Sequence, residues 1–133
     1  MATKKEKKEN KIKIVLVEDD AFLAGMYVTK LNLEGYDVHL ASDGEKGLKL
    51  VKEELPGIIL LDVILPKMSG FDVLKDLKAD AKTKNIPVIL LTNLGQRDDV
   101  KKGLDLGAVD YLIKAHFMPS EVVEKIKKLV KKV

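Results

Sequence analysis

Residues 58–70 constrain the fold more than any other stretch of this chain. Residues 58–61 are four consecutive apolar residues, and Asp62 follows them directly. A short apolar run without alternation is typical of a strand buried on both faces, as in a parallel sheet. Pro66 and Gly70 then indicate that the strand ends in a loop. Asp62 is therefore expected at the carboxyl end of a central strand, where open α/β sheets place their ligand sites.

Length and composition predict one cytoplasmic globular domain. A chain of 133 residues with 46% hydrophobic residues is long enough to bury a substantial core. It has no apolar run of the ~18 residues that a membrane span needs, and its N-terminus has no hydrophobic signal core. The absence of cysteine excludes disulfides and thiolate metal sites. We therefore expect no contact with a membrane.

The two ends of the chain are basic. Residues 1–13 carry six lysines and two glutamates, and residues 121–133 carry five lysines and two glutamates. Neither end contains arginine or an aromatic residue, the types that commonly bind nucleic acid. We interpret residues 1–10 as a disordered basic leader and residues 11–133 as the folded domain, and we expect no nucleic-acid binding through this domain.

Apolar segments alternate with segments of helical character along the chain. The expected strands are residues 13–17, 36–40, 58–61, 85–91 and 109–113. The expected helices are residues 21–34, residues 42–54, a helix beginning at Ser69, residues 96–106 and residues 119–131. Five strands alternating with five helices predict an α/β domain with a doubly wound, five-stranded parallel sheet. This pattern leaves the order of the strands open.

Three local details follow from the same patterns. Ser42 with Glu45 indicates a capping box at the start of the second helix, and Asp20 is a candidate cap for the first helix. His39 lies on the polar side of an alternating strand, so we expect it to face solvent.

Polar residues follow four of the expected strands, and a parallel sheet would bring all of them to one edge. They are Glu18, Asp19 and Asp20 after the first strand, Asp62 after the third, Thr92 after the fourth and Lys114 after the fifth. Clustered carboxylates repel one another unless a cation or protons compensate. Hard oxygen ligands without histidine or cysteine favour Mg²⁺, which bridges to phosphate oxygens. The cluster therefore predicts a phosphoryl-handling site in which one acid is the nucleophile.

Four separated motifs then resemble those of bacterial response-regulator receiver domains, chemotaxis regulators among them. The motifs are residues 17–20 (VEDD), 61–70 (LDVILPKMSG), 91–92 (LT) and 107–114 (GAVDYLIK). The resemblance extends from about residue 12 to the C-terminus, and the motifs occur in order with matching spacing. It implies a flavodoxin-like sheet of order 2-1-3-4-5. It also implies a phosphoryl group passed in the presence of Mg²⁺ from a histidine kinase, or from a phosphotransfer protein of a phosphorelay, to an aspartate.

The resemblance assigns a role to each acidic residue of the cluster except Asp20, which does not match a ligand position strictly. Asp62 resembles the phosphoacceptor and also a metal ligand. Asp19 resembles the direct Mg²⁺ ligand, and Glu18 resembles the acid that often acts through water. Ile64 would offer its backbone carbonyl to the metal.

Three further residues match the positions that respond to phosphorylation. Thr92 resembles the switch hydroxyl that moves toward the phosphoryl group, and Tyr111 resembles the aromatic switch whose ring rotates inward. Lys114 resembles the lysine that pairs with the phosphate. The family's output surface, formed by the fourth helix, fifth strand and fifth helix, would bind a downstream protein. Such a domain would catalyse only its own phosphorylation and dephosphorylation.

The chain departs from the family's pattern after its lysine. The family usually has proline there, often after a cis peptide bond, whereas here Ala115 follows Lys114. A cis bond before a residue other than proline costs about 2.5–4 kcal/mol. Either this bond is trans and the loop differs, or its surroundings hold a strained cis bond.

Two more positions bear on stability and on the lifetime of the phosphoryl group. Pro119 suits the first position of the last helix, which makes Met118 the N-cap, although a thioether cannot accept backbone N–H bonds. Ile64 and Leu94 match the positions that flank the approach of the hydrolytic water, and neither can orient it. Asn93, directly after Thr92, stands where the family more usually has a small residue, and it would narrow the access of water further. The resemblance therefore implies a long-lived phosphorylated state.

Several alternatives remain beside this interpretation. A flavodoxin-like redox protein would share the fold, but the acids of residues 18–20 would repel its phosphate. A hydrolase with an aspartyl nucleophile would need a cap and a substrate pocket, for which a chain of this length has no room. A degenerate receiver used only for docking is the strongest rival, although such a domain usually loses an acid or the lysine. The sequence leaves open whether the domain stands alone or belongs to a longer protein.

Overall fold

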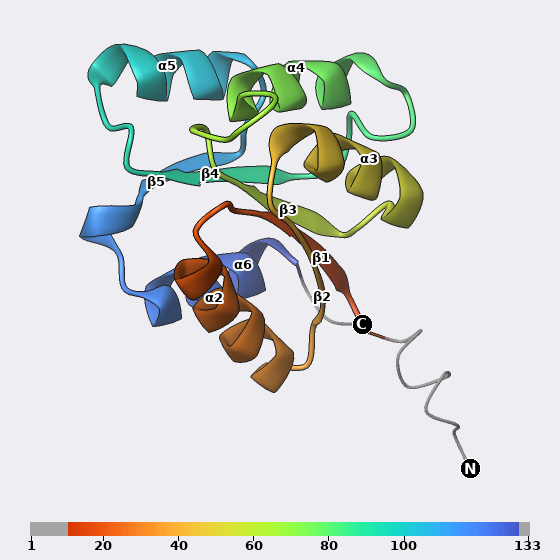
Figure 1. Cartoon of the computed structure of the whole chain (residues 1–133), viewed down its shortest axis with the longest axis vertical. Coiled ribbons are helices and arrows are strands. Elements are labelled where there is room, and N and C mark those ends of the chain that lie inside the picture. Colours follow the sequence, from red (N-terminus) through yellow and green to blue (C-terminus); the bar gives the residue numbers. More distant parts are fainter. Residues whose placement is uncertain (1–10, 131–133) are drawn as a thin grey trace.

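Five parallel strands form the centre of the molecule, and helices cover both faces of the sheet (Figure 1). The computed structural model describes residues 11–130. The strands are β1 (Lys13–Val17), β2 (Asp37–Ala41), β3 (Ile58–Leu61), β4 (Val88–Thr92) and β5 (Asp110–Ile113). Their order is β2-β1-β3-β4-β5, and every neighbouring pair is parallel. The α/β class and the order 2-1-3-4-5 are thus confirmed.

The helices divide into two layers. Within residues 11–130 they are α2 (Ala21–Leu33), α3 (Gly44–Glu54), α4 (Gly70–Ala79), α5 (Arg97–Asp105) and α6 (Pro119–Leu129), with a short 3₁₀ helix, η1 (Lys114–His116), after β5. Helices α3, α4 and α5 lie on one side of the sheet, and α2 and α6 lie on the other (Figure 1). The expected number of helices is therefore confirmed, while η1 was not predicted.

Strand β3 shows why its sequence is apolar without interruption. Ile59 and Leu61 belong to the core beneath α3 and α4, whereas Ile58 and Leu60 belong to the core beneath α2 and α6. Successive side chains of a strand point to opposite faces, so a strand covered on both sides needs an apolar residue at every position. All four side chains are completely buried.

The helix starts match the predictions at two sites and differ at a third. Asp20 caps α2 by accepting the N–H of Leu23 at 3.1 Å, as expected. Helix α4 has Ser69 as its N-cap, also as expected. The predicted Ser42–Glu45 capping box is wrong, because Asp43 is the N-cap of α3. Its extended backbone aims a charged carboxylate at the helix, which makes a stronger acceptor than a hydroxyl.

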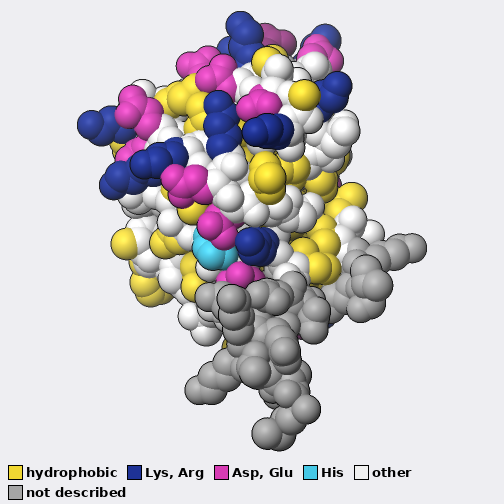
Figure 2. Space-filling view, turned by 90° about the vertical axis from the view of Figure 1, so that its right-hand side faces the viewer, with side chains coloured by type: hydrophobic (Ala, Val, Ile, Leu, Met, Phe, Trp, Pro, Cys, Tyr) yellow, Lys and Arg dark blue, Asp and Glu magenta, His cyan; other side chains and the backbone are white. Residues whose placement is uncertain are grey.

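His39 is partly exposed, as its place on the polar side of β2 led us to expect, but it also has acidic partners that the alternation did not indicate. Its Nε2 atom lies 3.1 Å from Oδ2 of Asp37 and 3.6 Å from Oε1 of Glu54, and its side chain is half-buried. Although β2 is an edge strand, the end of α3 reaches over it and places Glu54 beside the imidazole. Figure 2 shows a histidine among acidic and basic side chains on this face of the molecule.

The element boundaries differ slightly from the predicted ones. Strand β4 begins at Val88 instead of residue 85, because Pro87 has no N–H for the sheet. The predicted disordered leader, residues 1–10, lies outside the described residues, as does residue 131 of the last predicted helix. None of the helices within residues 11–130 is both long and apolar enough to cross a membrane.

Candidate functional site

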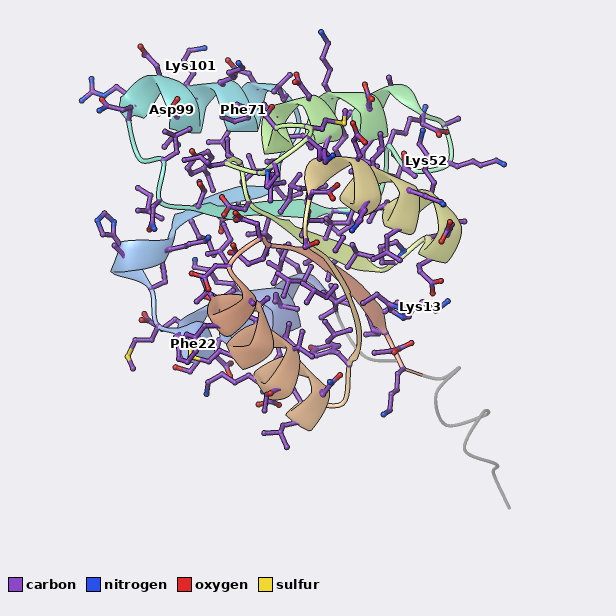
Figure 3. The ribbon with its side chains drawn as sticks, viewed as in Figure 1. Lys13, Phe22, Lys52, Phe71, Asp99 and Lys101 are labelled. Carbon is purple, nitrogen blue, oxygen red and sulfur yellow. The ribbon has the colours of Figure 1, made fainter. Side chains whose placement is uncertain are left out.

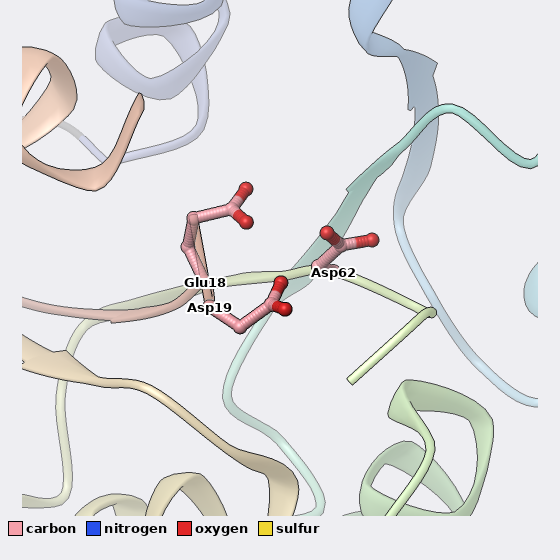
Figure 4. A group of neighbouring side chains, drawn as sticks. All are labelled: Glu18, Asp19 and Asp62. Carbon is pink, nitrogen blue, oxygen red and sulfur yellow. The ribbon is translucent and has the colours of Figure 1, made fainter. Parts of the chain in front are cut away.

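Three carboxylates converge at the carboxyl edge of the sheet. Glu18 and Asp19 follow β1, and Asp62 follows β3 (Figure 4). The two strands are neighbours, and Val17 pairs with Leu61, so the acids that come next in each strand lie side by side. One oxygen atom from each of the three carboxylates lies within 4.8 Å of the others. The predicted convergence of these residues is confirmed.

The three acids differ in their exposure to solvent. Glu18 and Asp62 are 3% and 6% exposed, whereas Asp19 is an exposed residue. Burial raises the pKa of Glu18, although the hydrogen bond from Lys114 and the N–H of Asp20 act in the opposite direction. Asp19 is thus the member of the group that faces solvent freely.

Lys114 bridges the two buried acids. Its Nζ atom lies 2.5 Å from Oε1 of Glu18 and 2.7 Å from Oδ2 of Asp62. Burial alone would lower the pKa of Lys114, but its bonds to Asp62 and Glu18 outweigh that effect and raise the pKa. The ammonium group therefore stays charged between the two carboxylates.

The loop after β5 keeps Lys114 in place without the proline of the family's pattern. No cis peptide bond occurs in residues 11–130, so the bond between Lys114 and Ala115 is trans. Of the two possibilities left open by the sequence, the trans bond is the one found. The chain turns directly into η1 at Lys114, and the side chain still reaches both acids.

The loop after β3 folds back on Asp62. The N–H of Ile64 donates to Oδ1 of Asp62 at 3.2 Å, which places the Ile64 backbone beside the phosphoacceptor candidate. The Ile64 side chain is 61% exposed. Farther along, the N–H of Gly70 donates to the carbonyl of Val63 at 2.8 Å and closes the loop as α4 begins.

Thr92 and Tyr111 meet at the main chain of Leu94. The hydroxyl of the fully buried Thr92 accepts the N–H of Leu94 at 3.3 Å. The Tyr111 hydroxyl donates to the carbonyl of the same residue. The Tyr111 ring is already turned inward in this structure and is 9% exposed. Sequence reasoning missed Leu94 as the link, because main-chain hydrogen bonds leave no pattern of residue types.

Helix α5 covers the Tyr111 ring. A Cβ atom at Gly103 would lie 2.8 Å from Cδ2 of Tyr111, so the ring occupies the space that a side chain there would need. Burial raises the pKa of Tyr111 to about 12, with smaller contributions from the charges of Asp99 and Asp62. Figure 3 shows Asp99 on α5 and Phe71 at the start of the neighbouring α4.

Tyr27 of α2 is a second residue that sequence reasoning did not assign to the site. It is 2% exposed, and burial raises its pKa, while the charges of Lys114 and Glu18 act on its phenol. Its position in an apolar helical stripe marks it only as a core residue, so the sequence gives no signal of this proximity.

The donor set suits a divalent cation next to a phosphoryl group. Carboxylate oxygens are the ligands that Mg²⁺ prefers, and a lysine beside them can balance the remaining negative charge. A parallel α/β sheet with an acid cluster, a lysine and a buried hydroxyl at its carboxyl edge thus presents groups that could hold a cation and phosphate oxygens together.

Comparison with known proteins identifies the family. Residues 14–127 match the response regulator receiver domain, and the chain belongs to this family. It is 39% identical over 120 residues to the DNA-binding dual master transcriptional regulator RpaA of Synechocystis, covering 90% of this chain and 49% of that protein. It is 40% identical over 115 residues to the DNA-binding response regulator MtrA of Mycolicibacterium paratuberculosis, covering 86% and 49%. The chain thus spans about half the length of these relatives.

A solved structure agrees with this assignment. The chemotaxis protein CheY4 of Vibrio cholerae superposes with a TM-score of 0.83 at 26% identity, over 90% of this chain and 99% of that one. The chain is therefore a receiver domain of the kind found in two-component response regulators, with the flavodoxin-like topology that the sequence motifs implied.

Proposed function

We propose that this receiver accepts a phosphoryl group on Asp62 from a histidine kinase or a phosphotransfer protein. The observation that supports this proposal best is the placement of Lys114 between Asp62 and Glu18, with Asp19 exposed at the same edge. A carboxylate oxygen of Asp62 would attack phosphorus as the P–N bond to the donor histidine breaks. Asp62 would then carry an acyl phosphate, and the histidine would leave with the electron pair of the broken bond.

The residues present fit a magnesium ion. Asp19, Asp62 and the backbone carbonyl of Ile64 would hold it directly, and Glu18 would act through water. When bound, Mg²⁺ offsets the negative charge that gathers on the phosphoryl oxygens during transfer. Asp19 is the exposed acid of the group, whereas Glu18 is buried and bonded to Lys114, which fits a direct contact for Asp19 and an indirect one for Glu18.

The roles proposed for Lys114 and Thr92 follow from hydrogen bonds that each side chain can exchange for a bond to the phosphoryl group. Lys114 would turn from the free Asp62 carboxylate to the phosphoryl oxygens, where its charge is needed. Thr92 would release its hydrogen bond from the N–H of Leu94, and its hydroxyl would donate a hydrogen bond to the phosphoryl group. Because Leu94 also accepts from Tyr111, a change at Thr92 reaches the aromatic side chain through one residue.

The output surface comprises α5, β5 and α6 and would bind a downstream protein. Leu104 on α5 and Val109 before β5 are 45% and 48% exposed, so this region offers apolar contacts. We propose that the domain itself contacts protein instead of nucleic acid or membrane. It would act as a switch that catalyses only its own phosphorylation and dephosphorylation.

Phosphorylation by acetyl phosphate tests this function. Intact mass measurement should show one added phosphoryl group in the presence of Mg²⁺ and none after chelation. Asp62→Asn should abolish the addition, because an amide cannot form the acyl phosphate. Addition of a phosphoryl group to that variant at another residue would disprove the assignment of Asp62. A parent protein that is never modified would favour the docking-only receiver.

A further inference from the structure

The loop that follows Asp62 rests against the first residue of α3. Asp43 fixes the start of this helix by accepting the N–H of Lys46 at 2.8 Å. The first N–H groups of a helix have no acceptor within the helix. That of Gly44 donates instead to the carbonyl of Pro66 at 3.2 Å. The end of one helix thus holds a loop that belongs to the candidate site.

The contact is too close for any side chain. A Cβ atom at Gly44 would lie 1.9 Å from the carbonyl oxygen of Met68 and 2.7 Å from its carbonyl carbon. Both atoms belong to the main chain, so no change of rotamer could relieve the overlap. Any residue larger than glycine would have to displace either the loop or the helix.

The loop has few other ways to absorb such a displacement. Its inner side is bonded to the phosphoacceptor through the N–H of Ile64, and its end is closed by the bond from Gly70 to Val63. Between these points Lys67 adopts a φ of 72°, which only a small set of residues tolerates readily. Displacement of the Met68 main chain would therefore also move Ile64 relative to Asp62.

We propose that Gly44 is a positioning residue for the phosphoacceptor loop: its bare backbone lets α3 hold residues 63–69 against the site and so sets the Ile64 carbonyl beside Asp62. This inference rests on the proposed function, because the Ile64 carbonyl matters as a metal ligand. Gly44 itself would touch neither metal nor phosphoryl group.

Gly47 offers a matched control within the same helix. A Cβ atom there would lie 2.8 Å from Cγ1 of Val17, so an alanine is also crowded, but against a side chain of β1 and not against residues 63–69. Gly44→Ala and Gly47→Ala therefore both replace a glycine of α3 and both create a steric conflict. They differ in whether the conflict falls on residues 63–69.

The experiment compares the two variants by amide NMR without metal and by Mg²⁺ titration. Gly44→Ala should shift the amide signals of Ile64, Lys67 and Met68 in the metal-free protein. It should also weaken Mg²⁺ binding by about tenfold, as supporting residues of metal ligands do. Gly47→Ala should leave these loop signals in place, because its steric conflict does not fall on residues 63–69. Equal effects of the two variants, or unshifted loop signals in Gly44→Ala, would overturn the proposal.

A second variant covers the case in which Gly44→Ala does not fold. Pro66→Gly adds no atom to the contact and keeps the carbonyl that accepts the Gly44 N–H, but it removes the ring that fixes the backbone of the loop at that carbonyl. It should increase hydrogen exchange at the Gly44 amide and shift the Ile64 signal, and unchanged exchange would overturn the proposal. If the parent binds no Mg²⁺, the proposed function fails, while the metal-free signals still decide the role of Gly44.

Discussion

The Nζ atom of Lys114 lies 2.7 Å from Oδ2 of Asp62, although 52 residues separate them in the chain. The same ammonium group lies 2.5 Å from Glu18, so one lysine bridges two buried acids. A lysine in this place competes for the charge that a metal ion would otherwise neutralise. The relationship yields a prediction about metal binding that does not depend on phosphorylation.

Lys114→Met should destabilise the metal-free domain and make it more responsive to Mg²⁺. Removal of the ammonium leaves Glu18 and Asp62 without their partner, at a cost of about 1–3 kcal/mol. Mg²⁺ would then offset a larger repulsion between these carboxylates than in the parent. It should therefore raise the urea midpoint of the variant more than that of the parent. An equal rise in both proteins would show that Lys114 and the metal do not compete.

Asp19 and Glu18 should contribute unequally to metal binding. Asp19→Ala removes the exposed acid proposed as a direct ligand, whereas Glu18→Ala removes a buried acid proposed to act through water. We expect Glu18→Ala to weaken Mg²⁺ binding by about 10–100-fold and Asp19→Ala to weaken it further. Isothermal titration of the two variants measures this difference, and identical affinities would contradict the division of roles.

The stability of the domain should fall above pH 10 partly because of Tyr111. Burial raises the pKa of this phenol to about 12 from the ordinary value of 10.0. The folded state therefore retains the proton more strongly than the unfolded chain. The resulting stabilisation is complete below pH 10 and is lost as the pH rises to about 12.

Tyr111→Phe should remove that contribution. Urea midpoints measured from pH 8 upward should decline less steeply above about pH 10 in the variant than in the parent. The phenolate absorbance of the folded variant should also lack the component with the highest pKa. A parent phenol that titrates at the ordinary value would refute the burial argument.

Met118→Thr should stabilise the last helix. Met118 is the N-cap of α6, its side chain makes no capping bond and it is 66% exposed. Its own N–H already donates to Oε1 of Glu121 at 2.9 Å, which is half of a capping box. A threonine hydroxyl would supply the other half and raise the free energy of unfolding by about 0.5–2 kcal/mol. A denaturant midpoint that does not rise would reject this prediction.

Ile64→Asn combined with Leu94→Glu should shorten the life of the phosphorylated state. Ile64 and Leu94 are apolar, and at their positions polar side chains could orient the hydrolytic water. We expect roughly tenfold faster decay, equivalent to about 1.4 kcal/mol in the barrier. Decay is followed after removal of the phosphodonor, with Mg²⁺ affinity as the control. Unchanged decay would show that these side chains do not control the lifetime.

The sequence by itself determined the fold class and the chemistry of the site. The apolar run before Asp62 predicted a strand covered on both faces, and both cores of the structure receive its side chains. The acids, hydroxyl and lysine after the other strands were recognisable because strand ends are local features. Periodicity and residue type carry this information without reference to the rest of the chain.

Only the tertiary structure decided which of these groups touch one another and through which atoms. The apolar and helical patterns alone leave strand order open, and the resemblance that implied it gave no contacts; pairing of β1 with β3 puts Glu18 beside Asp62. The trans bond after Lys114, the contact of His39 with Glu54 and the Leu94 link between Thr92 and Tyr111 likewise depend on neighbours distant in sequence. Such contacts are set by packing and main-chain hydrogen bonds, which residue patterns do not encode locally.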